Sequence, residues 1–343
     1  MQAGTFADGG LWAIQDTTLL TSVDAGVEWK ASTMPRPGSF GVLTAFVADA
    51  AHAWTVTAGP GSTDFTGAST DVLTLIVHRT SDGGTTWSDA MIPGSYPGTL
   101  QRLVFIDPLR GYVMASAQRH SVGPSTVLVT NDGGATWTVA GAAGALGIEF
   151  SVSDRSTLWS GAPQIAGGFL YALLDVSRDG GATWDDARLP DFVGAEGGGD
   201  VWLAGPPRFT DRSHGFVTLL VSGGTGTQTT RIDHTTDGGR SWVNVAADLR
   251  EAQTNVVVVD SRHWLLPVGN PLGLLATDDG GGTWHEMTPS GLGNVLVDWI
   301  EVVNGGHLAA LVATAESLPG PEELRLSSDG GQTWSEAALP NRP

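Results

Sequence analysis

The stretch Thr130–Trp137 reads TNDGGATW, and variants of this phrase recur along the whole chain. Six further copies end in the same residue type, at Trp29, Trp87, Trp184, Trp242, Trp284 and Trp334. Successive tryptophans lie 58, 50, 47, 58, 42 and 50 residues apart. Recurrence with a period near 50 residues is typical of a repeat architecture. The sequence therefore predicts seven copies of one structural unit.

Each copy of the phrase predicts a tight hairpin turn. A Gly-Gly pair accepts positive φ angles without steric cost, and the preceding aspartate can accept hydrogen bonds from N–H groups of the turn. One carboxylate per turn falls far short of the roughly 6–8 oxygen ligands that calcium takes. We therefore interpret the repeated aspartates and tryptophans as structural: Asp24, Asp82, Asp132, Asp179, Asp237, Asp279 and Asp329, with Trp29, Trp87, Trp137, Trp184, Trp242, Trp284 and Trp334.

A second landmark precedes each turn phrase. A short apolar run ends in aspartate, and an aromatic residue four or five positions later opens another apolar run. The pairs are Asp8 with Trp12, Asp49 with Trp54, Asp107 with Tyr112, Asp154 with Trp159, Asp211 with Phe216 and Asp260 with Trp264, replaced in the seventh copy by Asn304 and Leu308. In the third copy the pattern predicts four strands, at 103–107, 112–117, 126–131 and 136–140, because apolar residues alternate and no helical period is present.

Seven four-stranded units at this period predict an all-β fold, a seven-bladed β-propeller with four antiparallel strands in each blade. We expect one domain over 1–343, with blades at approximately 1–35, 36–93, 94–142, 143–190, 191–248, 249–290 and 291–343. The seventh copy ends with its own fourth strand, so we expect the ring to close without strand exchange. A ring in which the two termini share one blade is the alternative.

Composition excludes several classes of function. The net charge is −19, and Lys30 is the single lysine among seventeen basic residues. Such a chain repels nucleic acids and anionic membrane surfaces, and like charge favours a monomer. Cysteine is absent, and no apolar run approaches the ~20 residues needed to span a bilayer. We expect no metal, no cofactor and no membrane insertion, and an exported protein whose signal or anchor has been removed.

The phrase S/T-x-D-x-G-x-T-W resembles the Asp box, or BNR repeat, and the resemblance covers the whole chain. The overall repeat pattern of the chain is similar to that of photosystem II assembly-factor-like, sortilin-like and sialidase-superfamily propellers. The resemblance implies that each box joins the third and fourth strands of a blade, at the rim and away from the ligand face. It implies little about function, because one fold serves many functions.

The enzymes among these relatives fit the chain poorly. Sialidases carry an early Arg-Ile-Pro type motif and a late tyrosine nucleophile. The stretch MPRPGSF around Arg36 lacks the motif, and no tyrosine follows Tyr171. The related xyloglucanases resemble two facing propellers, and this chain supplies one. The resemblance therefore favours a protein- or ligand-binding role over a typical sialidase.

Long connections between the second and third strands, and between blades, are expected on the face opposite the boxes, where function usually lies. Their reactive side chains, with two residues that begin innermost strands, form the candidate ligand-binding set: Arg36, Tyr96, Arg102, Arg119, His120, Asp191, Glu196, Arg250, Glu251, Asp298 and Glu316. Four other histidines share one repeated turn position and are interpreted as structural: His52, His214, His263 and His307. No catalytic residue can be assigned.

Two functions remain open at this point. The first is an exported, non-catalytic binding or scaffold propeller that recognises a protein or an oligosaccharide. The second is a glycoside hydrolase or polysaccharide lyase acting on extracellular glycans. Two carboxylates about 5–10 Å apart in a concave opening would favour hydrolysis.

Overall fold

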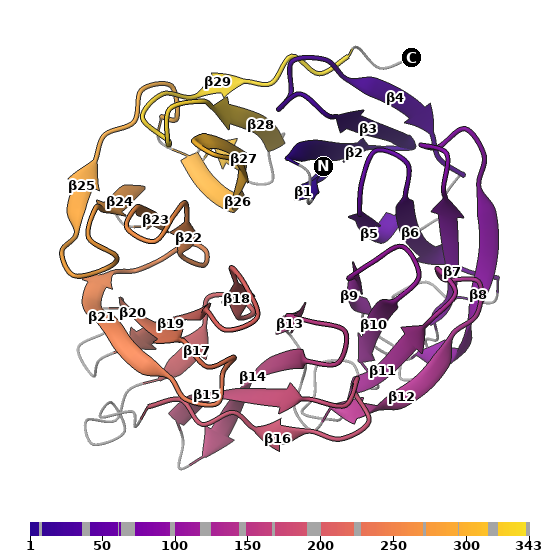
Figure 1. Cartoon of the computed structure of the whole chain (residues 1–343), viewed down its shortest axis with the longest axis horizontal. Helices are drawn as coiled ribbons and strands as arrows, with labels where there is room; N and C mark the ends of the chain where they lie inside the picture. The colour runs from indigo at the N-terminus through magenta and orange to yellow at the C-terminus, as the bar shows by residue number, and fades with distance from the viewer. Residues whose placement is uncertain are drawn as a thin grey trace.

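The computed structural model describes residues 1–6, 9–35, 42–60, 62, 73–96, 100–116, 125–143, 149–166, 169–190, 200–222, 228–269, 272–293, 295–314 and 322–340. Seven small antiparallel sheets stand around a central opening like the blades of a propeller (Figure 1). The predicted all-β, seven-bladed fold is confirmed. Within these residues no helix is long and apolar enough to cross a membrane.

In the first four blades the strands pair in chain order, from the innermost strand at the channel to the outermost at the rim. Blade 1 holds β1 (Gln2–Phe6), β2 (Gly10–Gln15), β3 (Thr18–Ser22) and β4 (Lys30–Thr33). Blade 2 holds β5 (Val42–Val47), β6 (Ala53–Ala58), β7 (Leu73–Thr80) and β8 (Ser88–Tyr96). Blade 3 holds β9 (Leu100–Phe105), β10 (Gly111–Ser116), β11 (Ser125–Thr130) and β12 (Thr138–Ala143). Blade 4 holds β13 (Glu149–Val152), β14 (Leu158–Ala166), β15 (Phe169–Ser177) and β16 (Asp185–Asp186).

The last three blades follow the same order with less regular innermost strands. In blade 5 that strand is split into β17 (Val201–Leu203) and β18 (Arg208–Phe209), which both pair with β19 (Gly215–Ser222), followed by β20 (Gln228–Thr235) and β21 (Val243–Arg250). Blade 6 holds β22 (Val257–Val258), β23 (Trp264–Val268), β24 (Gly273–Thr277) and β25 (His285–Met287). Blade 7 holds β26 (Val295–Asn304), β27 (His307–Thr314), β28 (Glu322–Ser327) and β29 (Ser335–Glu336).

The repeated phrase forms the turn between the third and fourth strands. In blade 2, the Thr80 hydroxyl donates to Asp82 Oδ1 (2.8 Å) and accepts from the Gly84 N–H (2.9 Å). The N–H and hydroxyl of Thr86 donate to Asp82 Oδ1 (2.9 Å) and Oδ2 (2.7 Å). The two glycines take φ angles of 68° and 81°, which residues with a side chain rarely adopt. Blades 3 to 7 repeat all four hydrogen bonds.

Blade 1 shows why its copy looks divergent. Asp24 still accepts hydrogen bonds from the Ser22 hydroxyl (2.7 Å) and the Glu28 N–H (2.9 Å). Glu28 has no hydroxyl for the fourth bond, and Ala25 replaces the first glycine at a φ of 56°. The turn therefore keeps its shape with fewer hydrogen bonds and some backbone strain.

The second landmark is the turn between the first and second strands. The aspartate carboxylate accepts the N–H groups two and three residues ahead, as Asp107 does from Leu109 (2.9 Å) and Arg110 (2.8 Å). Asp49, Asp154, Asp211 and Asp260 do the same. Asp8 lies outside the described residues. Both landmarks are thus aspartate-stabilised turns.

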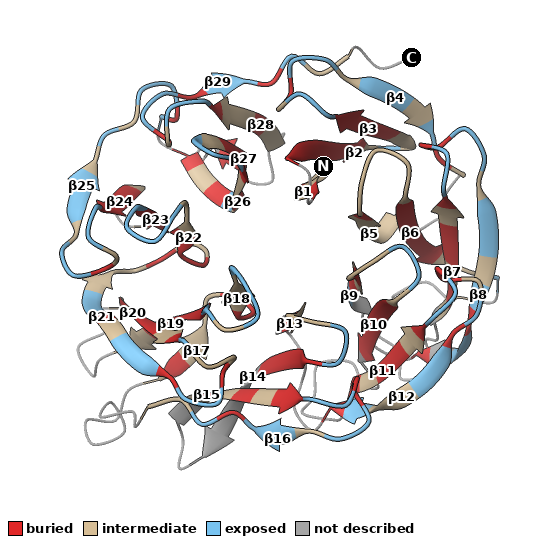
Figure 2. Ribbon diagram, in the orientation of Figure 1, coloured by how far each residue is buried: buried red, intermediate tan, exposed pale blue. Residues whose placement is uncertain are grey.

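The core consists of apolar layers between neighbouring blades, and burial is greatest in the middle strands (Figure 2). Between blades 2 and 3, the Trp54 ring stacks on Phe105 with centroids 3.8 Å apart, and Trp137 meets Phe105 edge-on at 6.0 Å. The Trp54 indole N–H donates to the Gly133 carbonyl of the next blade's turn (2.8 Å). Trp54 thus joins two blades, as its size and single polar atom favour.

The ring closes without strand exchange, as predicted, because each blade's sheet takes all its strands from one contiguous segment. β1 and β26 face each other across the seam. The Asn304 amide donates to the Gly9 carbonyl (3.2 Å), and the amino terminus pairs with Glu322. An apolar cluster of Leu11, Val303, Ala309, Leu324 and Ala337 fills the seam.

Strand ends differ slightly from the predicted ranges. In blade 3 the fourth strand begins at Thr138 instead of 136, because the Thr136 N–H and hydroxyl are bound to Asp132 inside the turn. β8 and β21 end at Tyr96 and Arg250, beyond the blade limits expected at 93 and 248.

Thr130→Val should destabilise the protein by about 1–3 kcal/mol, because it removes the hydroxyl that bonds Asp132 and leaves the buried Gly134 N–H without an acceptor. Urea unfolding measures the change. Thr126→Val on the same strand is the matched control, since the described residues give the Thr126 hydroxyl no hydrogen bond. Equal stabilities of the two variants would contradict the role of the hydroxyl.

Stability should fall steeply between about pH 4 and pH 2. The Thr86 N–H, followed by the hydroxyls of Thr86 and Thr80, lowers the pKa of Asp82 to about 2, and Asp179 and Asp279 also have a pKa of about 2. A carboxylate with a lowered folded-state pKa contributes stability above its unfolded pKa and loses it as pH falls. The melting temperature of Asp82→Asn should therefore fall less between about pH 4 and pH 2 than that of the unaltered protein. The rim variant Asp186→Asn should show the same fall as the unaltered protein.

Candidate functional site in the central channel

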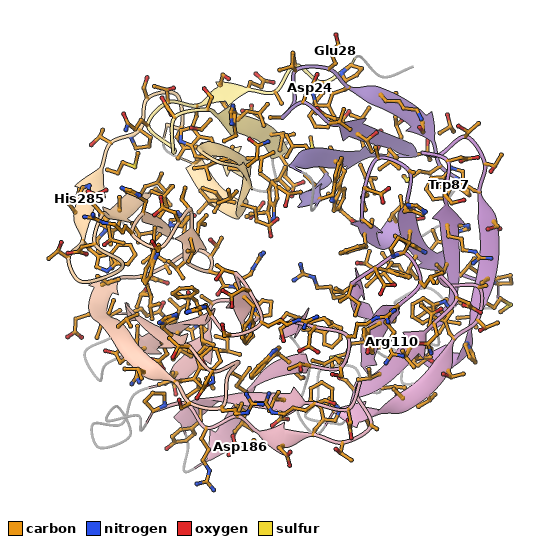
Figure 3. All side chains as sticks on the ribbon, viewed as in Figure 1. Asp24, Glu28, Trp87, Arg110, Asp186 and His285 are labelled. Atoms are coloured by element: carbon orange, nitrogen blue, oxygen red, sulfur yellow. The ribbon has the colours of Figure 1, made fainter. Side chains whose placement is uncertain are left out.

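Two cavities adjoin where innermost strands face the channel, into which side chains project (Figure 3). The Asp298 cavity measures about 350 Å³ and is lined from blades 5, 6 and 7, with Thr5 from blade 1. The Arg102 cavity measures about 410 Å³ and is lined from blades 3, 4 and 5. Both share the wall formed by Pro206, Arg208, Phe209 and Thr210. Their volumes lie in the range of small-ligand sites.

The shared wall exists because the innermost strand of blade 5 is broken. Pro206 and Pro207 have no N–H to donate to a sheet, so pairing stops between β17 and β18. The Asn255 amide of blade 6 donates to the Pro206 carbonyl (2.9 Å), and the Ser151 hydroxyl of blade 4 donates to the Pro207 carbonyl (2.8 Å). Both neighbouring blades thus fix the irregular segment.

Amide side chains of blade 6 connect the wall to blade 7. Gln253 accepts the Val297 N–H (2.9 Å) and donates to the Val268 carbonyl (2.8 Å), so both ends of its amide are engaged. Asn255 is only 8% exposed, and its Oδ1 has no hydrogen-bond partner among the residues that the structure describes. Asn255 Nδ2 must be the atom facing the Pro206 carbonyl, because two oxygens cannot share a hydrogen bond without a proton. The orphan atom is therefore an acceptor.

An ion pair spans the channel between non-adjacent blades. Arg208 of blade 5 pairs with Glu301 of blade 7, and the Thr5 hydroxyl of blade 1 donates to the same carboxylate (2.8 Å). Burial alone would raise the pKa of Glu301, but Arg208, Thr5 and the positive charge of Arg102 lower it below its ordinary value. Glu301 is therefore an ionised, engaged carboxylate.

Asp298 occupies a bulge of β26, where the pairing register with β27 shifts between Val297 and Trp299. Bulges re-aim side chains and are frequent beside functional sites. Asp298 is exposed and lines its cavity, and the described residues give its carboxylate no hydrogen bond or ion pair. Burial and the negative charge of Glu322 raise the pKa of Asp298, and the positive charge of the amino terminus offsets only part of this increase.

The Arg102 cavity concentrates positive charge. Arg102, Arg208 and Arg212 line it, while the single carboxylate in its described lining is Asp211. Asp211 is already bound within its own turn, to Ser213 and to His214 Nδ1 (2.8 Å). The chain carries a net charge of −19, so three arginines around one cavity depart strongly from the average surface.

The structure separates the predicted site residues. Arg102 and Asp298 reach the channel but line different cavities. Arg250 ends β21 beside Glu286 (3.4 Å), and Glu251 follows it; neither lines these cavities. Six members lie outside the described residues: Arg36, Arg119, His120, Asp191, Glu196 and Glu316.

Tyr96, a predicted ligand-binding residue of a loop, lies at the end of a strand and is buried. Tyr96 is the last residue of β8, 7% exposed within the core between blades 2 and 3. Its hydroxyl donates to the Pro93 carbonyl (2.6 Å), and burial raises its pKa. The apolar ring is buried because the strand continues three residues past the expected blade limit.

Sequence reasoning missed Arg208, Arg212, Glu301 and Asn255. A signal for two of them was present. Arg208 and Glu301 each lie three residues before the landmark that ends an innermost strand, Asp211 or Asn304, where the third copy has Val104. A charge at an otherwise apolar strand position points to the channel. The consecutive prolines Pro206 and Pro207 signal the strand break in the sequence, but nothing there links Asn255 to it.

No metal centre is formed by the part of the chain that the structure describes: no three histidine, aspartate or glutamate side chains there lie close enough to hold an ion. The histidines at the repeated turn position contact their own turn instead. His52, His214 and His263 approach Asp49, Asp211 and Asp260 through Nδ1, at 2.9, 2.8 and 2.7 Å.

No family model and no curated protein sequence matches the chain. Among solved structures, the chain is similar to YCF48 bound to D1 peptide, with a TM-score of 0.58 and 15% identity over 91% of this chain and 89% of that one. It is similar to a PL25 ulvan lyase, with a TM-score of 0.56 and 12% identity over 98% and 93%. The GH74 xyloglucanase from Xanthomonas campestris gives a TM-score of 0.53 and 17% identity over 88% of this chain and 45% of the enzyme. At these identities the likeness shows the fold alone.

Glu301→Gln should destabilise the protein by about 1–2 kcal/mol, because it leaves the Arg208 guanidinium without its anionic partner. The value lies below that of a fully buried pair because the Arg208 side chain is 38% exposed. Chemical denaturation measures the loss. The double variant Arg208→Met/Glu301→Gln should recover part of it, and Glu286→Gln at the exposed rim should change stability by less than about 0.5 kcal/mol.

Proposed function

We propose that this protein is a non-catalytic binding propeller that holds an acidic segment of a partner protein in its central channel. The observation that carries this proposal is the set of three arginines around one cavity of a strongly acidic chain. Guanidinium groups bind carboxylates through paired hydrogen bonds, and Arg208, which pairs with Glu301 through one Nη atom, carries further N–H donors. The exported location expected from the sequence remains part of this proposal.

The carboxylates of the channel favour binding over hydrolysis. Glycoside hydrolysis ordinarily uses a pair of carboxyl groups. Among the described residues lining the two cavities, the carboxylates are Asp211, Asp298 and Glu301. Asp211 is held in its turn and Glu301 is held by Arg208 and Thr5. One uncommitted carboxylate, Asp298, does not make a pair.

The aromatic residues of the cavity walls favour a protein ligand over a glycan. A flat ring open to solvent is a common platform for a sugar. Phe209 instead stacks on Trp159 (5.2 Å between centroids), and the buried Phe216 packs edge-on to Trp264 (4.8 Å). Trp299 is partly buried in the seam cluster. The similarity to YCF48, whose solved structure holds a D1 peptide, also supports a protein ligand.

A labelled acidic hexapeptide, Gly-Asp-Glu-Asp-Glu-Gly, should bind the protein, and its Asn/Gln counterpart should not. Arg212→Ala should weaken binding roughly threefold to tenfold, since one partly solvated charged contact is lost. Binding should also weaken as salt rises. Fluorescence anisotropy measures the affinities, with Arg188→Ala, an exposed arginine outside the channel, as the matched control.

Equal weakening by Arg212→Ala and Arg188→Ala would place the peptide outside the channel and contradict the proposal. Failure of the peptide, together with binding and cleavage of uronate oligosaccharides, would instead support the hydrolase or lyase.

A further inference from the structure

The channel contains its own example of how it holds a carboxylate. Glu301 accepts the Thr5 hydroxyl (2.8 Å) and pairs with one nitrogen of the Arg208 guanidinium. Burial raises the pKa of Glu301, yet Arg208, Thr5 and the positive charge of Arg102 together lower it below its ordinary value. One guanidinium nitrogen and one hydroxyl are thus sufficient direct partners for a carboxylate in this channel.

The Arg102 cavity supplies more donors than such a carboxylate needs. Arg102, Arg208 and Arg212 all line this space of about 410 Å³. Arg102 of blade 3 and Arg208 of blade 5 both act on the Glu301 carboxylate, which shows that the two side chains lie near each other. The described residues give the Arg212 guanidinium no hydrogen bond or ion pair. Since each guanidinium carries five N–H donors, the cavity concentrates both donors and positive charge.

The carboxylates of a peptide cannot be brought to a single point in this cavity. Successive side chains of an extended segment point to opposite sides. Residues two positions apart share a side at a spacing of about 6.6 Å, and a sphere of the cavity's volume is about 9 Å across. A phosphate or sulfate ester instead presents three terminal oxygens and one or two negative charges on one central atom.

We infer that the Arg102 cavity is a binding site for a phosphate or sulfate ester on the partner's acidic segment, with Arg102, Arg208 and Arg212 around its terminal oxygens. Three guanidiniums can each donate to a different oxygen of a tetrahedral group, and such charge-assisted hydrogen bonds are strong. Asp211, in the same lining, is bound by N–H groups of its own turn. This inference rests on the proposed function, because the ester belongs to the same segment.

The probes are labelled pentapeptides, Gly-Ala-X-Ala-Gly, in which X is phosphoserine, aspartate, serine, phosphotyrosine or sulfotyrosine. Fluorescence anisotropy should give the phosphoserine peptide a dissociation constant at least about tenfold below that of the aspartate peptide, because more oxygens and more charge are held. The serine peptide should not bind. Tighter binding of the phosphotyrosine peptide would identify a phosphate ester as the ligand, and tighter binding of the sulfotyrosine peptide would identify a sulfate ester.

Arg212→Ala should raise the dissociation constant of the phosphoserine peptide at least about tenfold. Arg212→Lys keeps the charge but loses the planar fork, so it should recover only part of the affinity. Arg188→Ala, an exposed arginine outside the channel, is the matched control and should change nothing. Equal affinities for the phosphoserine and aspartate peptides, or equal effects of the two alanine variants, would overturn the inference.

The acidic hexapeptide separates this inference from the proposed function. If the phosphoserine and aspartate peptides bind equally while the hexapeptide binds through Arg212, the inference fails and the proposed function stands. If the phosphoserine peptide binds through Arg212 and the hexapeptide does not bind, the ester site stands and recognition of an unmodified acidic segment fails. Inorganic phosphate that competes as strongly as the phosphoserine peptide would assign the cavity to the free anion and overturn the inference.

Discussion

In each blade, the aspartate of the repeated phrase and the turn that it stabilises set the distance to the preceding blade. The aspartate of the repeated phrase binds the hydroxyl two residues before it and the N–H four residues after it, which fixes two glycines at positive φ and with them the direction of their carbonyls. Those carbonyls then meet the preceding blade: Ser32 donates to Gly83, Trp54 to Gly133 and Arg178 to Gly238. The same motif closes a hairpin and sets the distance between blades. This explains why aspartate, glycine and a hydroxyl residue recur together.

The channel differs from the rim, because the innermost strands that line it are irregular whereas the rim turns repeat. Blade 5 has a broken innermost strand, blade 6 a two-residue one and blade 7 a bulged one, and these three blades adjoin. Backbone groups freed from the sheets are taken up by Ser151, Gln253 and Asn255, so the distortion is stable. Charged side chains that a regular strand would press against a neighbouring blade are turned into the channel instead.

The fold could be predicted from the sequence because its causes are local. The residues of the turn phrase supply the donors and acceptors of the turn's own hydrogen bonds, and seven copies at a nearly constant period determine the number of blades. Ring closure followed from the complete seventh copy. The site could not be predicted in the same way, since the Arg208–Glu301 pair joins residues 93 positions apart through a channel that exists only once the ring has closed. Tyr96 was misplaced because a loop residue and a strand-end residue look alike in one sequence.

Closure without strand exchange has a consequence for biosynthesis. Each blade is complete once its own contiguous segment has left the ribosome, and it needs contacts only with the blade made just before it. Such nearest-neighbour order favours folding from the first blade onward. The seam between β1 and β26 brings the first and last blades together, so the face of blade 1 that carries Leu11 stays uncovered until the last blade arrives. During that interval the nascent chain presents an apolar surface of the kind that chaperones bind.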